Sequence, residues 1–303
     1  MQPRRAGVTV HRRGFVCSAL ALSLAGCEIL PETPLPEAAQ PRFVPWPGPA
    51  RLALVLSSGG PRGFSHVGVL KALNEIGVKP DLIVGASVGA LLGSVVCAGA
   101  SIRDVEALAL EFDFKSLVQL SLSRLYKLSG RQLGAFVNAE IARRVGNTSL
   151  EKLPVRFAAV AADAQTGEAV AFNTGDAGRA VQASCAIPGQ FDAVEIRGRL
   201  YADGDLVTPL PVRLTRSMGA LRVIAVDCTA RPESAPPGAE RYRESDLRKK
   251  TLVDAEARLA DLVLHPDIGY WVNLGREYRE RTARTAYEYT LARRAEILRV
   301  AGA

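Results

Sequence analysis

The chain alternates short apolar runs with longer segments in which apolar residues recur at helical spacing. Runs typical of buried parallel strands occupy Leu52–Ser57, Leu82–Val84 and Leu221–Asp227. Helices are predicted for Phe64–Ile76 and for Val88–Ala98, the second of them apolar enough to be central and buried. Strands that alternate with helices in this way predict an α/β layered fold with a mostly parallel central sheet.

The rest of the chain adds a hairpin and more helices to this pattern. The hairpin is predicted for Val155–Asp163 and Glu168–Asn173, around a turn at Gly167. Residues 231–245 are rich in proline and charge and are predicted to form a surface loop. Helical spacing recurs in four segments, the last two of them highly charged: Ser101–Phe114, residues 131–146, Glu244–Leu264 and Arg276–Val300.

The N-terminus has the pattern of an export signal rather than of a folded element. Four arginines without an acidic residue precede the apolar run 14–26, which is too short to span a bilayer. The run ends in small residues followed by Cys27. This resembles the lipobox of bacterial lipoproteins, in which the signal is cut before the cysteine and the cysteine carries lipid. The resemblance implies a membrane anchor on Cys27, with enough acyl chains to be stable.

Two alternatives remain for this segment. One is an ordinary secretory signal in which Cys27 is incidental, and the other is a twin-arginine export motif, part of which Arg12-Arg13 resembles. Glu28 follows the cysteine, where an aspartate would resemble an inner-membrane retention signal. We therefore expect a lipoprotein on the periplasmic side of a membrane, with the outer membrane favoured.

Behind the predicted signal, residues 1–26, the chain divides into a tether and a domain. Residues 27–50 are dense in proline and lack apolar periodicity, which predicts an extended tether. The folded domain is predicted to occupy residues 51–303, with its core at about 51–230 and a helical C-terminal part at 244–303. About 250 residues can bury a substantial core and fit one large domain.

The net charge of +7 does not indicate a nucleic-acid partner. The chain has 38 lysines and arginines against 31 acidic residues. Four of the arginines lie in the predicted signal, and their removal leaves 34 basic against 31 acidic residues. The remaining excess of positive charge is too small to argue for binding to a polyanion.

The cysteines indicate neither disulfides nor a metal site. Cys97, Cys185 and Cys228 are scattered through the predicted domain, and neither a Cys-x-x-Cys motif nor a histidine pair accompanies them. We interpret them as small core residues.

The strongest chemical signal is the segment 85–89, which reads Gly-Ala-Ser-Val-Gly and joins a predicted strand to a predicted helix. A nucleophile elbow requires this context, because its serine sits in a strained turn that small neighbours such as Gly85 and Gly89 permit. The N–H of Val88 at the helix start would favour negative charge on an oxygen reacting with Ser87. The alternative is a serine that only caps a helix.

A second turn, Ser57–Gly63, joins the first predicted strand to its helix and reads SSGGPRG. It lacks the Gly-Lys-Ser/Thr of a Walker loop, and its spacing does not fit a dinucleotide-binding motif. It offers backbone N–H groups beside one cation, which suits an oxyanion hole or a phosphate, whereas the alternative is a flexible loop. The candidate oxyanion-hole residues are Gly59, Gly60, Pro61, Arg62, Gly63 and Val88.

A third motif, Asp203-Gly204, follows the predicted strand end Arg199–Tyr201. A carboxylate beside a glycine can approach another backbone closely. Taken alone, an Asp-Gly pair indicates only a turn.

Together the three motifs resemble those of the patatin-like phospholipase family, in which a Gly-Gly-x-Arg-Gly loop, a G-x-S-x-G serine and an Asp-Gly pair form the active site. The segments 59–63, 85–89 and 203–204 match in order and rough spacing, and Ser184–Gly189 is also similar. The resemblance covers about residues 51–230. It implies a three-layer α/β/α fold and cleavage of acyl esters in a lipid or phospholipid substrate, with no metal and no cofactor.

The resemblance also implies a mechanism. Ser87 attacks an ester carbonyl while Asp203 accepts its proton, and backbone N–H groups of the 59–63 loop and of Val88 bind the oxyanion. Arg62 is expected either to orient the loop or to meet a substrate phosphate. Asp205 departs from the family, which usually has Gly or Ala there. Its carboxylate either raises the pKa of Asp203 or points away.

Three other functions remain open at this stage. An α/β-hydrolase triad would use Ser87 with Asp203 or Asp227 and His265, the one histidine that follows the serine in the chain. The protein would otherwise be a non-catalytic lipid-binding or assembly lipoprotein on the same fold, or an enzyme that transfers the acyl group to an acceptor other than water. His66 precedes the serine, and is interpreted as a packing or capping residue, or else as a support beneath the loop.

Overall fold

The computed structural model describes residues 34–111 and 130–302. The predicted signal, Cys27 and the first part of the predicted tether lie outside the described residues. Within the described ranges, no helix combines the length and the apolar character needed to cross a bilayer.

A mixed sheet in the order β5-β6-β3-β2-β1-β7-β8 forms the centre of the domain, and β4 pairs with β3. The pairs among β3, β2, β1, β7 and β8 are parallel, and β4, β5 and β6 join by antiparallel pairs. This confirms the predicted, mostly parallel sheet and the hairpin. The strands are β1 (Ala50–Leu56), β2 (Leu82–Ala86), β3 (Arg156–Asp163), β4 (Ala169–Phe172), β5 (Val194–Ile196), β6 (Arg199–Asp203), β7 (Ala220–Val226) and β8 (Leu262–Leu264).

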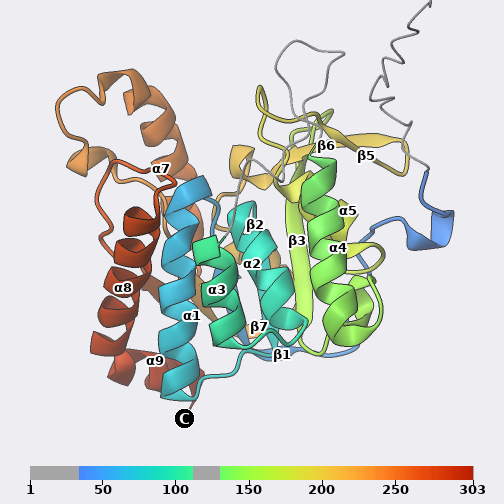
Figure 1. Cartoon of the computed structure of the whole chain (residues 1–303), viewed down its shortest axis with the longest axis horizontal. Coiled ribbons are helices and arrows are strands. Elements are labelled where there is room, and N and C mark those ends of the chain that lie inside the picture. The colour runs from blue at the N-terminus through green and yellow to red at the C-terminus, as the bar shows by residue number, and fades with distance from the viewer. Residues whose placement is uncertain (1–33, 112–129, 303) are drawn as a thin grey trace, which may run out of the picture. The chain divides into compact units, whose positions relative to one another are not determined.

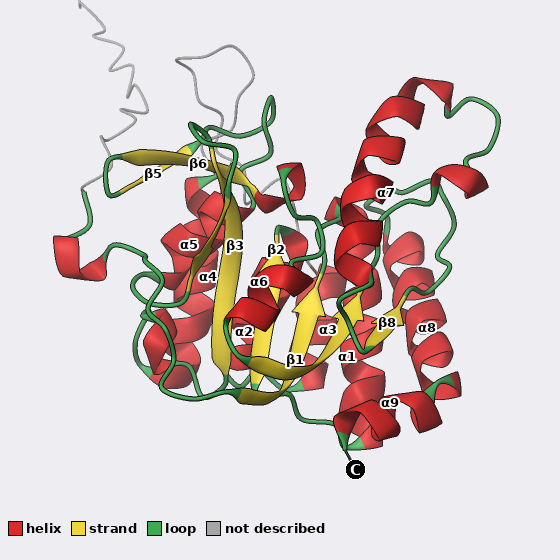
Figure 2. Ribbon diagram, turned by 180° about the vertical axis from the view of Figure 1, so that it is seen from behind, coloured by secondary structure: helices red, strands yellow, loops and turns green. Residues whose placement is uncertain are grey.

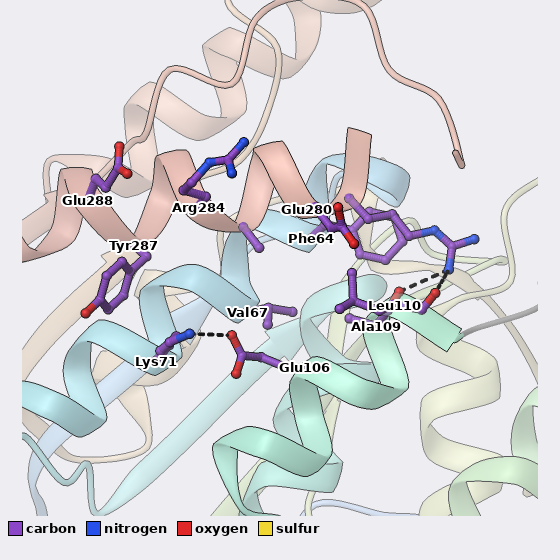
Figure 3. Close-up of a pocket in the computed structure, with 12 residues that line it drawn as sticks. Phe64, Val67, Lys71, Glu106, Ala109, Leu110, Glu280, Arg284, Tyr287 and Glu288 are labelled. Atoms are coloured by element: carbon purple, nitrogen blue, oxygen red, sulfur yellow. Dashed lines mark hydrogen bonds and ion pairs between the residues drawn. The ribbon is translucent and has the colours of Figure 1, made fainter. Parts of the chain in front are cut away.

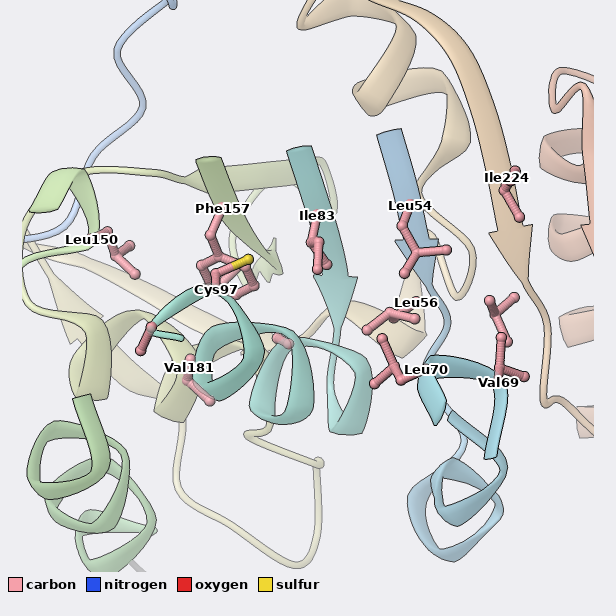
Figure 4. Close-up of a cluster of buried hydrophobic side chains, with 14 of the residues drawn as sticks. Leu54, Leu56, Val69, Leu70, Ile83, Cys97, Leu150, Phe157, Val181 and Ile224 are labelled. Carbon is pink, nitrogen blue, oxygen red and sulfur yellow. The ribbon is translucent and has the colours of Figure 1, made fainter. Parts of the chain in front are cut away.

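Side chains of the central strands alternate between two apolar layers, because successive residues of a strand point to opposite faces. In β1, Leu54 and Leu56 pack into the larger cluster shown in Figure 4, whereas Ala53 and Val55 pack into a second cluster on the other face. Both faces of the strands are therefore buried, which explains why their sequences are continuous apolar runs.

Helices cover both faces of the sheet and complete the predicted three-layer arrangement (Figures 1 and 2). The face of the larger cluster carries α1, α2, α4, α5, α8 and α9, while α6 and α7 cover the other face. The helices are α1 (Phe64–Ile76), α2 (Val88–Cys97), α3 (Ile102–Glu111), α4 (Arg131–Val145), α5 (Ala177–Ser184), α6 (Val212–Ser217), α7 (Arg243–Ala257), α8 (Arg276–Ala292) and α9 (Arg294–Ala301).

One predicted helix is partly wrong. The segment Glu244–Leu264 forms α7 only as far as Ala257, and Leu262–Leu264 forms β8. Its backbone continues the sheet, with Ile224 opposite Leu262 and Val226 opposite Leu264. Pairing with a neighbouring strand supplies hydrogen bonds that a three-residue apolar segment cannot make alone, so the sheet decides its conformation.

The chain lies against the domain well before Arg51, where the sequence predicts the tether to end. Asn173 exchanges two hydrogen bonds with the backbone of Val44, and Arg42 pairs with Thr174. Trp46 packs against the second apolar cluster. Side-chain and backbone hydrogen bonds and the packing of Trp46 therefore fix residues that proline content alone marks as extended.

Candidate active site

The segments that join strands to helices meet at one edge of the sheet, where the parallel strands end. The Gly-rich loop follows β1 and Ser87 follows β2, and the strands are in register, with Leu56 opposite Gly85. Because the carboxyl ends of parallel strands lie at the same edge, the first two sequence motifs are brought together by the sheet itself.

Ser87 occupies the strained turn expected of a nucleophile elbow. Its φ of 52° and ψ of −124° place it outside the helix that begins at the next residue. Its glycine neighbours are required by space: a Cβ on Gly85 would lie 2.4 Å from the carbonyl carbon of Gly89, and a Cβ on Gly89 would lie 2.2 Å from the carbonyl oxygen of Leu56. The close packing of α2 on β1 and β2 thus holds the strained serine in place.

The Ser87 hydroxyl donates to the Asp203 carboxylate, with 2.7 Å between Oγ and Oδ2. Both residues are buried, Asp203 with 1% of its surface exposed. Loss of solvation by burial raises the pKa of Asp203 to about 7, and the nearby Asp205 charge adds to this, against hydrogen bonds from the Asp205 backbone and from Ser87. The carboxylate is thus able to exchange a proton near neutral pH.

Asp205 both raises the pKa of Asp203 and has partners of its own. Its Oδ1 accepts from the Ser58 hydroxyl, its Oδ2 lies 2.7 Å from Lys249 Nζ, and its backbone N–H donates to Asp203 Oδ1 at 2.8 Å. Both possibilities left open by the sequence therefore apply. The Asp205 charge acts on Asp203, while its side chain links the Gly-rich loop to α7.

Ser184 holds the backbone of Ser87. Its Oγ accepts from the Ser87 N–H at 2.9 Å and donates to the Val160 carbonyl at 2.6 Å. Ser184 is completely buried, so neither partner has water as a substitute. The residue lies in the segment 184–189 noted in the sequence, but its role depends on α5 packing against β3.

The Gly-rich loop presents only some of its predicted donors. Pro61 has no N–H, and the Arg62 N–H donates to the Gly59 carbonyl at 3.1 Å. Gly60 begins a short 3-10 turn, Gly60–Gly63, and Val88 begins α2, so neither N–H has an acceptor within its own helix. Both residues line the same apolar pocket. Gly60 and Val88 are therefore candidate oxyanion donors that border a pocket.

Two glycines shape this loop. Gly60 has a φ of 54°, in the left-handed region, with open space where a Cβ would stand. Gly63 packs on Val88, the residue after Ser87, since a Cβ at position 63 would come within 2.4 Å of the Val88 methyl groups. Absence of a side chain at position 63 thus brings the loop against the start of α2.

The Arg62 guanidinium is used inside the protein. It donates to the backbone carbonyls of Gly269, at 2.9 Å, and of Tyr270, and it lies 5.8 Å from the centre of the Tyr270 ring. Arg62 is buried, with 8% of its surface exposed. Of the two roles predicted for Arg62, the contacts support the orientation of the loop.

His66 lies beneath the loop, with its Nε2 2.9 Å from the Ser57 carbonyl oxygen and 3.5 Å from Cys228 Sγ. It is completely buried, and burial lowers its pKa to about 4. The neutral ring therefore donates to Ser57 and supports the loop from inside.

His265 is placed away from Ser87. Its Nδ1 lies 2.8 Å from the Asp227 carbonyl oxygen, and its Nε2 accepts from Arg231 at 3.0 Å. His265 follows β8 and Ser87 follows β2, which are three strand spacings, roughly 14 Å, apart. Both ring nitrogens have partners, so the structure does not assemble the alternative triad.

Among the described residues, two cavities near these elements bear on the site. A narrow apolar one of about 40 Å³ adjoins the donors and is lined by side chains of α2, α3 and α4, among them Leu92, Leu108 and Phe136, together with Gly60 and Val88. A larger one of about 370 Å³ lies between α1, α3 and α8 and has the Lys71–Glu106 ion pair in its wall (Figure 3). Only the first of the two is bordered by candidate oxyanion donors.

Residues 34–111 and 130–302 contain no group of three or more His, Cys, Asp or Glu side chains placed to hold a metal ion. Cys97 and Cys228 are buried and Cys185 is partly buried, and all three are free thiols. Burial raises the pKa of Cys228 to about 12, so this thiol is an uncharged packing group behind Gly59.

The sequence reasoning missed two contributors, Ser184 and Lys249. The segment around Ser184 was noted, but nothing local indicates which backbone its hydroxyl meets. Lys249 lies in a run of charges typical of a solvated helix face. Only the position of α7 relative to the turn after β6 reveals its contact with Asp205.

Comparisons with known proteins show which family and fold this chain resembles. A family model described as patatin-like phospholipase matches residues 54–216. An uncharacterised NTE family protein of Mycobacterium bovis is 38% identical over 180 residues, which cover 58% of this chain and 48% of that protein. The human patatin-like phospholipase domain-containing protein 6 is 33% identical over 187 residues, covering 60% of this chain and 14% of that protein.

A fungal relative and a solved structure extend the comparison. The lysophospholipase NTE1 of Coccidioides immitis is 30% identical over 189 residues, covering 62% of this chain and 12% of that protein. The chain thus spans about half the length, or much less, of these relatives. VipD of Legionella pneumophila has the same fold, with a TM-score of 0.62 at 14% identity, covering 88% of this chain and 72% of VipD.

Proposed function

This chain belongs to the patatin-like phospholipase family, and from that premise we propose that it is a serine hydrolase that cleaves acyl esters of lipids. The observation that carries the proposal is the 2.7 Å hydrogen bond from the Ser87 hydroxyl to Asp203, beside two backbone donors. A buried carboxylate that takes up a proton near pH 7 is suited to act as a general base for that hydroxyl.

In the proposed reaction, Ser87 Oγ forms a bond to the ester carbonyl carbon while its proton passes to Asp203 Oδ2. The negative charge on the former carbonyl oxygen is stabilised by the N–H groups of Gly60 and Val88. The carbon–oxygen ester bond then breaks, and the alcohol leaves with the proton held by Asp203. Water repeats the sequence on the acyl-enzyme, which releases the fatty acid and restores the serine.

The lipid character of the substrate is supported by two observations. The pocket beside Gly60 and Val88 is lined by aliphatic and aromatic side chains, which favour a hydrocarbon chain over a polar acyl group. One relative carries the name lysophospholipase. A phospholipid or lysophospholipid is therefore the proposed substrate class.

Attachment to a membrane through lipid on Cys27, on the periplasmic side, is part of the proposal and is supported by the signal pattern of residues 1–27. The lipid would keep the enzyme within reach of its substrate. Metabolic labelling with a fatty acid, followed by fractionation, tests this part. A Cys27→Ser protein that still takes up label would exclude it.

The central test is hydrolysis of medium-chain p-nitrophenyl esters and of a lysophospholipid, together with labelling of the serine by a fluorophosphonate. We expect hydrolysis and labelling in the wild type and their loss, by about 10³-fold or more, in Ser87→Ala. Ser217→Ala is a matched control, because Ser217 is an exposed serine at the end of α6 whose hydroxyl donates to the Leu214 carbonyl of its own helix. Retained activity in Ser87→Ala would refute the assignment.

A wild-type protein that hydrolyses none of these esters and takes no label would instead favour the non-catalytic lipoprotein. Added alcohol separates hydrolysis from acyl transfer, since a transferase would yield a new ester. The product distinguishes the two reactions while the same serine serves both.

A further inference from the structure

Five large apolar side chains, Tyr242, Leu247, Trp271, Val272 and Leu274, form an exposed group that we term the apolar rim. Their exposed fractions are 38%, 46%, 50%, 41% and 42%. They come from the start of α7 and from the segment before α8. Single exposed apolar residues are ordinary, whereas a contiguous group marks a surface with a partner.

Direct contacts join the two segments of the apolar rim. The rings of Tyr242 and Trp271 meet edge to face with 6.3 Å between centroids, and those of Tyr270 and Trp271 with 5.2 Å. The Tyr270 hydroxyl donates to Asp246 at 2.5 Å. These contacts hold the two segments of the apolar rim together, and Leu247, Val272 and Leu274 are exposed on the same two segments.

The same segments contact both catalytic loops. Lys249, two residues beyond Leu247, pairs with Asp205 next to the proposed base. The carbonyls of Gly269 and Tyr270 accept from Arg62 of the Gly-rich loop. Figures 1 and 2 show α7 and its adjoining loops extending past the sheet at the end where β1 and β2 finish. The apolar rim thus lies on the side of the molecule that carries Ser87.

Positive side chains accompany the apolar ones. Arg241, Arg243 and Arg248 are exposed, and the Arg241 guanidinium lies 4.6 Å from the centre of the Tyr242 ring. Among the nearby acids, Asp246 already accepts from Tyr270, and Glu240 and Glu244 leave the segment 240–250 with a positive balance. Tryptophan and tyrosine next to arginine are the residues that settle at the headgroup level of a bilayer.

We propose that the apolar rim docks the domain on a phospholipid bilayer that contains anionic lipid, with Trp271, Val272 and Leu247 inserted at the headgroup boundary. This adds a contact from the folded domain itself to the anchor proposed for Cys27. This proposal rests on the proposed function only for what docking achieves, because docking would bring Ser87 to ester bonds at the lipid surface. Docking itself requires no hydrolysis.

A second copy of the chain fits the apolar rim less well. Five side chains that are half exposed or less cover well below the roughly 800 Å² per partner that a stable protein interface buries. Insertion into a bilayer has no such requirement, because a few apolar side chains and basic neighbours act together.

The test uses Trp271 as its own reporter, since the chain has only two tryptophans. The full chain with Ser87→Ala and Trp46→Phe retains Trp271 alone and leaves vesicles intact. It is mixed with vesicles of phosphatidylcholine and phosphatidylglycerol that carry spin-labelled lipid. The matched control carries Ser87→Ala and Trp271→Phe and retains Trp46. The Trp46 ring centre lies 6.0 Å from the Arg156 guanidinium. Trp46 precedes β1 and Arg156 begins β3, so Trp46 lies at the end of the strands opposite to Ser87.

We expect the Trp271 emission to shift to the blue and to be quenched by the spin label, and the Trp46 emission to change little. A Trp271 that stays unquenched on vesicles that the protein binds would overturn the proposal. So would Trp271 burial that depends on protein concentration without lipid, which would make the rim an interface between copies. Quenched Trp271 in a chain whose wild type hydrolyses no ester would leave docking intact and refute the proposed function.

Variants test whether insertion depends on the rim. In the Trp271 reporter, with Cys27→Ser to remove the anchor, Leu247→Ser with Val272→Ser should raise the lipid concentration for half-maximal quenching about tenfold or more. Leu221→Ser is the control, because Leu221 is 62% exposed but lies near the start of β7. Equal effects of both changes, or none from the rim pair, would contradict the proposal.

Discussion

Lys249 Nζ lies 2.7 Å from Asp205 Oδ2, so a cation on α7 balances the carboxylate that stands two residues from Asp203. The two charges act on Asp203 in opposite directions, since Asp205 raises its pKa and Lys249 lowers it. The proton affinity of the proposed base is therefore adjustable from a distance, by residues that do not touch Ser87.

This pairing predicts the pH dependence of activity. Asp203 must be ionised to accept a proton, so kcat/KM should rise with pH through about 7. Asp205→Asn removes the like charge and should move this rise to lower pH. Lys249→Met removes the cation and should move it to higher pH. Profiles measured on a soluble short-chain ester check the prediction.

The two variants are expected to move the pH profile in opposite directions, so each serves as a control for the other. General loss of folding would lower the rate at all pH values without moving the profile. Shifts in the same direction for both variants would show that Asp205 and Lys249 do not act on Asp203 by charge.

Asp203→Asn should lower activity strongly and yet stabilise the protein above neutral pH. The folded-state pKa of about 7 exceeds the ordinary value of 3.8, so the folded protein holds a proton that the unfolded chain releases. Stability from this group is present below pH 3.8 and is lost as pH rises through 7. The loss amounts to at most about 4 kcal/mol.

Urea unfolding of wild type and Asp203→Asn at pH 5 and pH 8 measures this effect. The asparagine variant should gain more stability at pH 8 than at pH 5, while its kcat falls by about 10²-fold or more. An equal change in stability at the two pH values would mean that the buried Asp203 carboxylate is not the source of the pH dependence.

Ser184→Ala should lower kcat more than it changes KM. The variant leaves the Ser87 N–H and the Val160 carbonyl without their buried partner, which costs about 1–3 kcal/mol of stability. The elbow then loses the bond that orients it, and a small displacement of the nucleophile slows reaction by up to about 10²-fold. The rate of fluorophosphonate labelling reports this directly.

Ser94→Ala is the matched control for Ser184. Ser94 is equally buried and lies on α2, but its hydroxyl donates to Leu91 within the same helix. If both variants slowed labelling alike, the effect would belong to a general loosening of α2 rather than to the hold on Ser87.

His66→Gln should make the protein more resistant to acid. The folded-state pKa of about 4 lies below the ordinary 6.5, so the unfolded chain takes up a proton first as pH falls. Stability is therefore lost as pH drops from about 6.5 through 4, by about 3 kcal/mol in total. A glutamine amide can still donate to the Ser57 carbonyl and does not titrate.

Unfolding measured at pH 7, 5.5 and 4.5 checks this prediction. The wild type should lose more stability over this range than His66→Gln. If both proteins lost the same stability over this pH range, groups other than His66 would determine the sensitivity to acid.

Leu108→Trp should reduce activity on long acyl chains while sparing an acetyl ester. Leu108 on α3 lines the apolar pocket next to Gly60 and Val88, and a larger ring there would displace hydrocarbon. Each methylene excluded costs about 0.8 kcal/mol, so loss of three carbons lowers kcat/KM by about 50-fold. The ratio of rates on decanoyl and acetyl p-nitrophenyl esters is the measurement.

Ala107→Trp adds the same ring one residue away, at an exposed position of α3 outside the pocket lining. It should leave the ratio unchanged. A drop in both variants would place the acyl chain elsewhere.

Much of the fold followed from local pattern. Phe64–Ile76 was predicted with the bounds that α1 has, because the apolar spacing and a stop at Gly77, with its φ of 88°, are both encoded nearby. The hairpin of β3 and β4 was found for the same reason. β8 was missed, because three apolar residues have no preference of their own and become a strand only beside β7.

The same division applies to the site. The sequence determined that Ser87 stands on a glycine-flanked turn between a strand and a helix, since that geometry depends on five consecutive residues. It also identified Asp203 through resemblance. Only the tertiary structure decided that Asp203 reaches Ser87, that Ser184 and Lys249 assist, and that His265 pairs with Asp227. Hydrogen bonds and pKa shifts depend on distance and burial, and both arise when residues from 38 to 116 positions apart pack together.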